Sequence, residues 1–232
     1  TGKLGEVIAS PLVTLVDDGA LVRGLGSSPY DAEGVRTRRN VLVDAGRCAA
    51  FAYDHYHSRR TGAALTRNGI RGFASTPGIG YHNLFVEPGA PSQASNVKSL
   101  DRGFWYDDSG SYGFNSVTGD YSFQAQGWWI ENGEKAFPVE GVTVAGNSLD
   151  MLKSVAAVGN DLEFRSSVAC PTLLIGEMTP KIFAANHPEP VIFAVAWPLK
   201  VLMTVCYPVA VSFTWASRVL LRTLRIPTKR RS

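Results

Sequence analysis

Three histidines are the first candidates for metal or acid–base chemistry. His55 and His57 are separated by one residue in "HYH", and His82 stands alone in "GYHNLF". On a helix, residues two apart point to different faces; on a strand they would share a face, but no third ligand is near in the sequence. A zinc peptidase needs a pair such as HExxH to hold the metal and activate water, and that pattern does not occur. We therefore interpret the three histidines as surface or structural residues.

Other residue types with chemical potential are equally open to a structural interpretation. Asp17-Asp18 and Asp107-Asp108 are paired carboxylates, which the solvation of a strand end or a turn explains as well as acid–base catalysis does. Ser122 has no recognisable histidine and aspartate partners. The Gly-rich "GIRGFASTPGIG" lacks the lysine of a phosphate-binding loop. The residues alone therefore assign no catalytic side chain and no cofactor-binding residue.

Cysteine usage and charge describe the setting of the chain. Cys48, Cys170 and Cys206 are odd in number and form no CxxC pair, which indicates a reduced, cytoplasmic location without a disulfide framework. The sequence opens on Thr1 without a signal peptide, and we read it as continuing from upstream sequence. The net charge of +3 divides into −4 for the first 178 residues and +7 for the remainder. An acidic first part argues against nucleic-acid binding, and the asymmetry favours two units.

The first 175 residues carry signals of β structure interrupted by short helices. Residues 40–54 predict a hairpin that turns at Asp44-Ala45-Gly46, and 102–108 together with 112–146 predict a meander whose clearest turn is Asn132-Gly133. A short helix is expected over 55–63, ending near Gly62. Further expected elements are a strand over 82–89, a helix over 148–159 capped by Asn147 or Ser148, and strands within 161–175.

The last part of the chain has a different texture. From Val191 to Ser217 the only charged residue is Lys200, and basic residues follow. A membrane-spanning helix needs about 20 apolar residues, so this stretch predicts a hydrophobic helical tail that contacts a membrane through 191–217. A pair of buried core helices is the alternative.

The first part resembles the C-terminal domain of the TldD/PmbA (TldE, modulator of DNA gyrase) family over residues 3–179. The stretches that carry the resemblance are "SPLVTLVDD", "GSSPYDAEGVRTRRNVLVDAGR", "NLFVEPG", "VTGDYSFQAQGWWIENGEKAFPVEGVTVAGNSLDMLKSVAAVGNDLEFRSS" and "PTLLIGEMT". The resemblance implies a two-subunit peptidase in which the TldD-type subunit supplies zinc from an HExxxH helix and a later cysteine. The ending "VGNDLEFRSSVACPTLLIGEMT" has the pattern of the PmbA/TldE-type partner, which lacks those ligands.

That resemblance raises one residue as a metal-ligand candidate. Cys170 invites comparison with the TldD-type cysteine, but it lies in the "VAC" of the PmbA-like ending and no histidine pair accompanies it. A zinc site needs three protein ligands, so we interpret Cys170 as a non-ligand. The zinc of the assembly is then expected in a TldD-like partner, and none in this chain.

The tail resembles the end of the CNNM/CorC membrane domain, a magnesium and cobalt efflux family. The residues that carry this are the "GExxPK" signature at Glu177, Pro180 and Lys181, then "WPL" and "YPV". In that family the glutamate of the signature lies near the transported ion. Glu177 is the matching position, and a carboxylate suits magnesium; without the earlier spanning helices, a turn residue is the preferred interpretation.

Together these patterns predict an α+β chain: a mostly antiparallel β domain with a few short helices, residues 1–178, followed by the hydrophobic helical tail, residues 179–232. The expected function is that of a non-zinc PmbA/TldE-like component, or a fragment of one, in a peptidase assembly. It would act on peptides with a TldD-like subunit as a heterodimer, or by self-association, with no nucleic-acid partner. The alternatives are a fragment of a magnesium/cobalt efflux protein and a non-enzymatic binding module.

Overall fold

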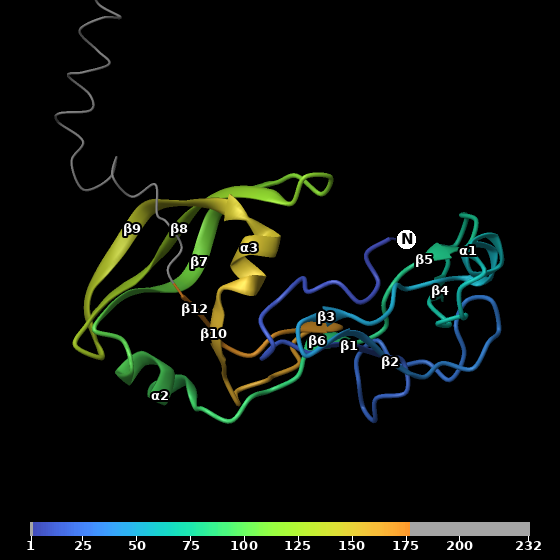
Figure 1. The fold of residues 1–232 in the computed structure, drawn as a ribbon, viewed down its shortest axis with the longest axis horizontal. Helices are drawn as coiled ribbons and strands as arrows, with labels where there is room; N and C mark the ends of the chain where they lie inside the picture. Colours follow the sequence, from blue (N-terminus) through green and yellow to red (C-terminus); the bar gives the residue numbers. More distant parts are fainter. Residues whose placement is uncertain (1, 177–232) are drawn as a thin grey trace, which may run out of the picture. The chain divides into compact units, whose positions relative to one another are not determined.

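The computed structural model describes residues 2–176, apart from the side chains of residues 109–112. Figure 1 shows this part as strands linked by loops and a few short helices. A five-stranded sheet has the order β11-β6-β1-β2-β3. Its strands are β11 (Val168–Ala169), β6 (Leu84–Val86), β1 (Leu15–Asp18), β2 (Arg39–Asp44) and β3 (Arg47–Cys48).

The central strand β1 is paired on both sides. Its Val16 faces Val41 of β2 and Phe85 of β6, and both pairings are antiparallel. The β11–β6 pairing is parallel. Val16 is fully buried, because its β-branched side chain packs well between neighbouring strands.

The predicted hairpin over 40–54 is confirmed for its first half. Strands β2 and β3 turn at Ala45 and Gly46, whose φ values of 43° and 79° are those of a tight hairpin turn. A Cβ at Gly46 would lie 2.4 Å from the carbonyl oxygen of Ala9, so only glycine fits there. Residues 49–54 leave the sheet and lead into helix α1 (His55–Thr61), which was predicted and ends at Gly62 with φ 69°.

The predicted meander is confirmed as a three-stranded sheet with the order β7-β8-β9. Asn132 and Gly133, with φ values of 51° and 78°, form the predicted turn between the second and third strands. Two short strands, β4 (Gly69–Ile70) and β5 (Gly78–Ile79), pair within the expected loop 66–80. The meander strands are β7 (Arg102–Phe114), β8 (Asp120–Glu131) and β9 (Glu134–Asn147).

The predicted helix over 148–159 is half wrong. Asn147 caps α3 (Ser148–Lys153) through a bond from the Leu149 amide, but β10 (Val155–Val158) follows directly. Strand β10 pairs with β12 (Leu173–Ile175), so tertiary pairing overrides the helical pattern. The remaining helix, α2 (Gln93–Lys98), was not predicted and begins at Ser92.

Two small apolar clusters form the core of the described part. One gathers Val13, Val43, Val86, Val155 and Val158, with Ala9. The other gathers Val16, Phe85 and Ala169, and the Phe85 ring meets the Phe164 ring edge to face at 5.3 Å. The five-stranded sheet and the β10–β12 pair thus share the first cluster.

The predicted fold class is wrong in its last element. The described residues form a mostly β fold with three short helices, none of which is long and apolar enough to cross a membrane. No hydrophobic helical tail is therefore shown in the part of the chain that the structure describes, and the tail expected over 179–232 lies outside that part.

Candidate functional site

A buried carboxylate organises the loops next to the central strand. Asp17 is 0% exposed, and its two oxygens accept hydrogen bonds of 2.7 Å from the Asn68 side-chain amide and the His82 backbone amide. The ring Nδ1 of His82 lies 3.5 Å from the same carboxylate. A buried charge without such partners would be strongly unfavourable, so this network fixes where residues 66–83 run over β1.

Buried asparagines extend this network. Asn68 also donates to the carbonyl of Gly80 at 2.8 Å, and Asn40 of β2 donates to the carbonyl of Thr66 at 2.8 Å. The amide of Asn68 donates to the carbonyl of Tyr53, just before α1. The segment that carries α1 is thereby tied to β1 and β2.

Helix α1 presents basic side chains from a well-defined start. Asp54, 2% exposed, caps the helix by accepting bonds of 2.7 Å from the His57 amide and the His57 ring Nδ1. Desolvation acts to raise the pKa of Asp54, but the hydrogen bonds and charge of His57 outweigh it and lower that pKa. Arg59 and Arg60 occupy the last turn, where positive charge is favourable.

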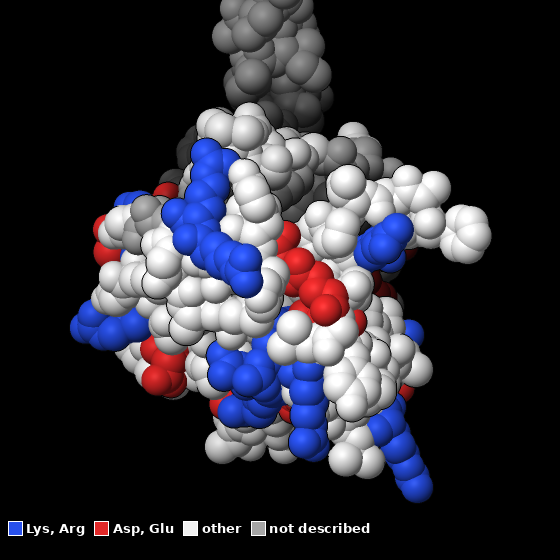
Figure 2. All heavy atoms as spheres, turned by 90° about the vertical axis from the view of Figure 1, so that its right-hand side faces the viewer, with Lys and Arg blue, Asp and Glu red and all other residues white. Residues whose placement is uncertain are grey.

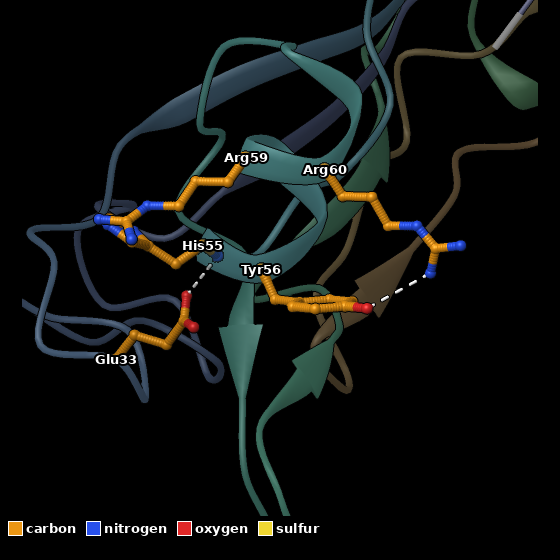
Figure 3. Close-up of a pocket in the computed structure, with 5 residues that line it drawn as sticks. All are labelled: Glu33, His55, Tyr56, Arg59 and Arg60. Carbon is orange, nitrogen blue, oxygen red and sulfur yellow. Dashed lines mark hydrogen bonds between the residues drawn. The ribbon is translucent and has the colours of Figure 1, made fainter.

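An open pocket of about 550 Å³ lies against α1, lined by Glu33, His55, Tyr56, Arg59 and Arg60. Figure 3 shows the Arg59 side chain extending toward His55 and the Arg60 side chain extending toward Tyr56. Arg60 donates a hydrogen bond of 3.3 Å to the Tyr56 hydroxyl. Glu33 accepts a bond of 2.7 Å from the His55 amide. The pocket therefore combines two guanidinium groups, a phenol and an imidazole with one engaged carboxylate, a set suited to binding an anion.

The basic character extends beyond the pocket. Figure 2 looks at the end of the molecule that carries α1, β4 and β5, where Lys and Arg side chains gather. We call six side chains from this part of the sequence the arginine group: Arg36, Arg38, Arg59, Arg60, Arg67 and Arg71. Arg38, Arg60, Arg67 and Arg71 donate hydrogen bonds to neutral oxygens, and no ion pair among the described residues involves any of the six.

The surroundings of Cys170 favour its protonated thiol. Although the residue is exposed, desolvation of its thiol and then the Asp161 carboxylate raise the pKa of Cys170 to about 11. The protonated thiol that results is a poor nucleophile near neutral pH. Asp161 is itself engaged by the Thr172 hydroxyl at 2.6 Å and the Thr172 amide at 3.0 Å.

The other sequence candidates are dispersed. Asp18 caps a turn by accepting the Ala20 amide at 2.9 Å, and Ser122 is an exposed residue of β8. Asp107 and Asp108 lie on β7. Among the described residues they belong to no group of three or more side chains that could hold a metal. Glu177 and Cys206 lie outside the described residues.

The described residues show no zinc site. In the described part of the chain no three His, Cys, Asp or Glu side chains converge as a ligand set. His57 is committed to Asp54, and His82 is buried beside Asp17.

Sequence reasoning missed both the pocket and the buried network. In the sequence, Arg59 and Arg60 belong to the end of a short predicted helix, and Glu33 lies more than 20 positions earlier. Asn40 and Asn68 lie 28 positions apart, and no sequence pattern connects them. A run of nine arginines and no lysine between residues 19 and 82 was the one available signal.

Comparison with known families gives a match over most of the chain. The model of the PmbA/TldA metallopeptidase C-terminal domain matches residues 1–181. A second model, the cyclin M transmembrane N-terminal domain, matches residues 166–232, less than a third of the chain and almost all of it outside the described residues.

Individual relatives agree with the first match. The chain is 35% identical over 176 residues to metalloprotease PmbA of Escherichia coli O157:H7, covering 76% of this chain and 37% of that protein. It is 30% identical over 165 residues to a metalloprotease TldD homolog of Haemophilus influenzae, and this match covers 70% of this chain and 34% of that protein. The crystal structure of TldE from Thermococcus kodakarensis superposes with a TM-score of 0.70 at 31% identity, covering 75% of this chain and 41% of that one.

These relatives are much longer than the matched part. The chain spans little more than a third of the length of the curated relatives it matches. The sequence match at more than 30% identity and the structural match at a TM-score of 0.70 both cover nearly all the described residues. The chain belongs to the PmbA/TldA metallopeptidase C-terminal domain family.

Proposed function

We propose that this chain is a PmbA/TldE-type component of a peptidase assembly whose zinc is held by a TldD-type partner subunit. The similarity to TldE, at TM-score 0.70 and 31% identity, carries the proposal. The 35% identity to PmbA supports it. Similarity to a TldD homolog is lower, at 30%.

The chemistry of the described residues supports the same division of labour. No HExxxH pattern occurs in the 232 residues, and the raised pKa of Cys170 disfavours a thiolate ligand. We propose a boundary near residue 178 between the family domain and the remaining sequence, and a cytoplasmic location for the assembly. Heterodimer formation is preferred over self-association, because the family resemblance implies a TldD-type partner for a PmbA/TldE-type subunit.

Co-purification with a TldD-type subunit tests this proposal. The full chain is expressed alone and with the subunit, and each sample is analysed for complex size, zinc content and cleavage of an unstructured peptide. We expect a complex with stoichiometric zinc and cleavage, and neither zinc nor cleavage from the chain alone. Stoichiometric zinc and cleavage by the purified chain alone would overturn the proposal, as would failure to form any complex.

A further inference from the structure

Positive charge is concentrated in one part of the described chain. Residues 19–82 contain nine arginines and four acidic residues, whereas residues 83–176 contain five basic and eleven acidic residues. Two of the four acids in the first segment, Asp31 and Asp54, are buried. The solvent therefore meets a surface whose guanidinium groups greatly outnumber its carboxylates.

Four members of the arginine group, Arg38, Arg60, Arg67 and Arg71, are oriented by neutral hydrogen-bond acceptors that do not compensate their charge. Arg67 donates to the carbonyl of Arg36 at 3.3 Å, and Arg38 donates to the carbonyl of Leu65 at 3.2 Å. Arg71 donates to the carbonyl of Ser75 at 3.1 Å. A carbonyl contact orients a guanidinium without neutralising it, so other N–H donors of the fork still have a full positive charge for a ligand.

The backbone at Arg67 is unusual. Its φ of 67° lies in the left-handed region, which side-chain-bearing residues other than Asn and Asp rarely adopt. Such conformations cost about 1–3 kcal/mol and cluster at functional positions. The chain keeps an arginine at a position where glycine or asparagine would be less strained.

Exposed aromatic rings are interleaved with these arginines. Tyr56 in the pocket is 61% exposed, Tyr30 is 58% exposed, and Phe73 is fully exposed. Aromatic and arginine side chains are the types most enriched at binding surfaces, since both give large contact energy for little lost conformational freedom. Charge and exposed aromatic surface thus coincide in the same segment.

We propose that this surface, centred on the pocket of Glu33, His55, Tyr56, Arg59 and Arg60, binds an extended acidic peptide segment. Arg59 and Arg60 hold carboxylates of the peptide, and the Tyr56 ring covers an adjoining apolar group. The inference rests on the proposed function, because it names the kind of peptide that the assembly would take up.

Two features favour a peptide over a nucleic acid. Residues 83–176 have a net charge of −6, which repels a long polyanion that carries phosphate at every unit. A peptide concentrates its charge on a few side chains that fit one pocket.

Binding is tested on the full chain, without a partner and without cleavage, so its outcome is separate from that of the proposed function. Fluorescence anisotropy is measured with labelled twelve-residue peptides of one design that carry Glu, Gln or Lys at the same positions, and with a single-stranded DNA of equal length. We expect binding of the Glu peptide that weakens with added salt and about tenfold or more weaker binding of the Gln peptide. No variant is needed for this comparison.

A pair of matched variants locates the site. R59Q/R60Q removes two charges from the pocket, and R102Q/K153Q removes two charges from exposed positions of β7 and α3. We expect the first to weaken binding of the Glu peptide about tenfold or more, because two charge-assisted contacts are lost. The second is expected to change it about twofold or less. Thermal melts confirm that each variant is folded.

Three outcomes would overturn the proposal. The Glu and Gln peptides could bind equally, the DNA could bind more tightly than the Glu peptide, or R102Q/K153Q could weaken binding as much as R59Q/R60Q. Loss of peptidase activity in the reconstituted assembly with peptide binding intact would instead count against the proposed function alone.

Discussion

The segment of residues 19–82 and the meander of residues 102–147 differ in how they are held together and in what they present to solvent. The first is anchored by a fully buried carboxylate and by strands that share an apolar core, and it presents arginine. The second buries only Ala125 and Ile130 among its described apolar side chains and has six acidic residues against two basic ones.

Aromatic pairs take the place of a core on the meander. The Lys135 ammonium lies 4.4 Å from the Trp105 ring centroid, and the Trp129 and Phe137 rings stack at 6.5 Å. Such contacts stabilise by about 0.5–1.5 kcal/mol each, far less than a buried side chain contributes. One region is thus built to hold a fixed binding surface, and the other is held by its ladder of strand pairing.

The largest predicted effect comes from removing the buried carboxylate. Asp17→Ala leaves the Asn68 side chain and the His82 amide without their acceptor, so we expect a loss of about 3–5 kcal/mol in the free energy of unfolding. Asp44→Ala, at an exposed strand end, is the control and should cost about 0.5 kcal/mol or less. Urea denaturation measures both, and equal losses would remove the contrast between buried and exposed carboxylates.

A smaller loss is predicted where the meander has its one large buried side chain. Ile130 is 0% exposed, so Ile130→Ala should destabilise the chain by about 2–4 kcal/mol. Phe137 on the neighbouring strand is 49% exposed, and Phe137→Ala should cost about 1 kcal/mol from the lost stack. Chemical denaturation monitored by tryptophan fluorescence measures the free energy of unfolding of both variants. A larger loss for Phe137→Ala than for Ile130→Ala would mean that the exposed aromatic surface contributes more to stability than the buried side chain.

The turn of the meander predicts a third, still smaller effect. Gly133 has φ 78°, and an added Cβ would lie 3.0 Å from the Cα of Lys98, so Gly133→Ala should cost about 1–2 kcal/mol. Gly141 has φ 73° with nothing within 4 Å, so Gly141→Ala reports the backbone strain alone and should cost about 1 kcal/mol. If the two losses are equal in thermal melts, the contact with Lys98 contributes nothing.

The smallest effect concerns the pH response of Cys170. Its pKa is raised from 9.0 to about 11, so the folded chain favours the neutral thiol. The contribution to stability is complete below pH 9 and is lost as the pH rises through about 11. Alkylation of Cys170, followed by mass spectrometry of its peptide, should have its midpoint near pH 11 when folded and about two units lower in urea. Coincident midpoints would contradict this.

Local signals in the sequence predicted the parts of the fold that are determined by local chemistry. The turn at Asn132-Gly133 and the end of α1 at Gly62 depend on residues that accept positive φ, and both were predicted. The second half of the 148–159 helix was wrong because Val155–Val158 pair with Leu173–Ile175, a partner that no local pattern reveals.

The candidate site was beyond sequence reasoning for the same physical reason. Glu33 and His55 meet only because Asn68, Asp17 and the strands of the five-stranded sheet bring their loops together. The histidine pair "HYH" attracted attention as a metal candidate, whereas His57 serves to hold the capping carboxylate of Asp54. Charge was averaged over 178 residues, which concealed the excess of arginine in one segment.

Mapping of a photo-crosslinked peptide tests most directly that the arginine-rich segment, and not the meander, is the recognition surface. An acidic peptide with a central photoreactive phenylalanine is irradiated with the full chain, and the linked fragments are identified by mass spectrometry. The account predicts links to residues 30–73, centred on Tyr56, that an excess of unlabelled acidic peptide abolishes. Links that fall chiefly within residues 102–147 would contradict it.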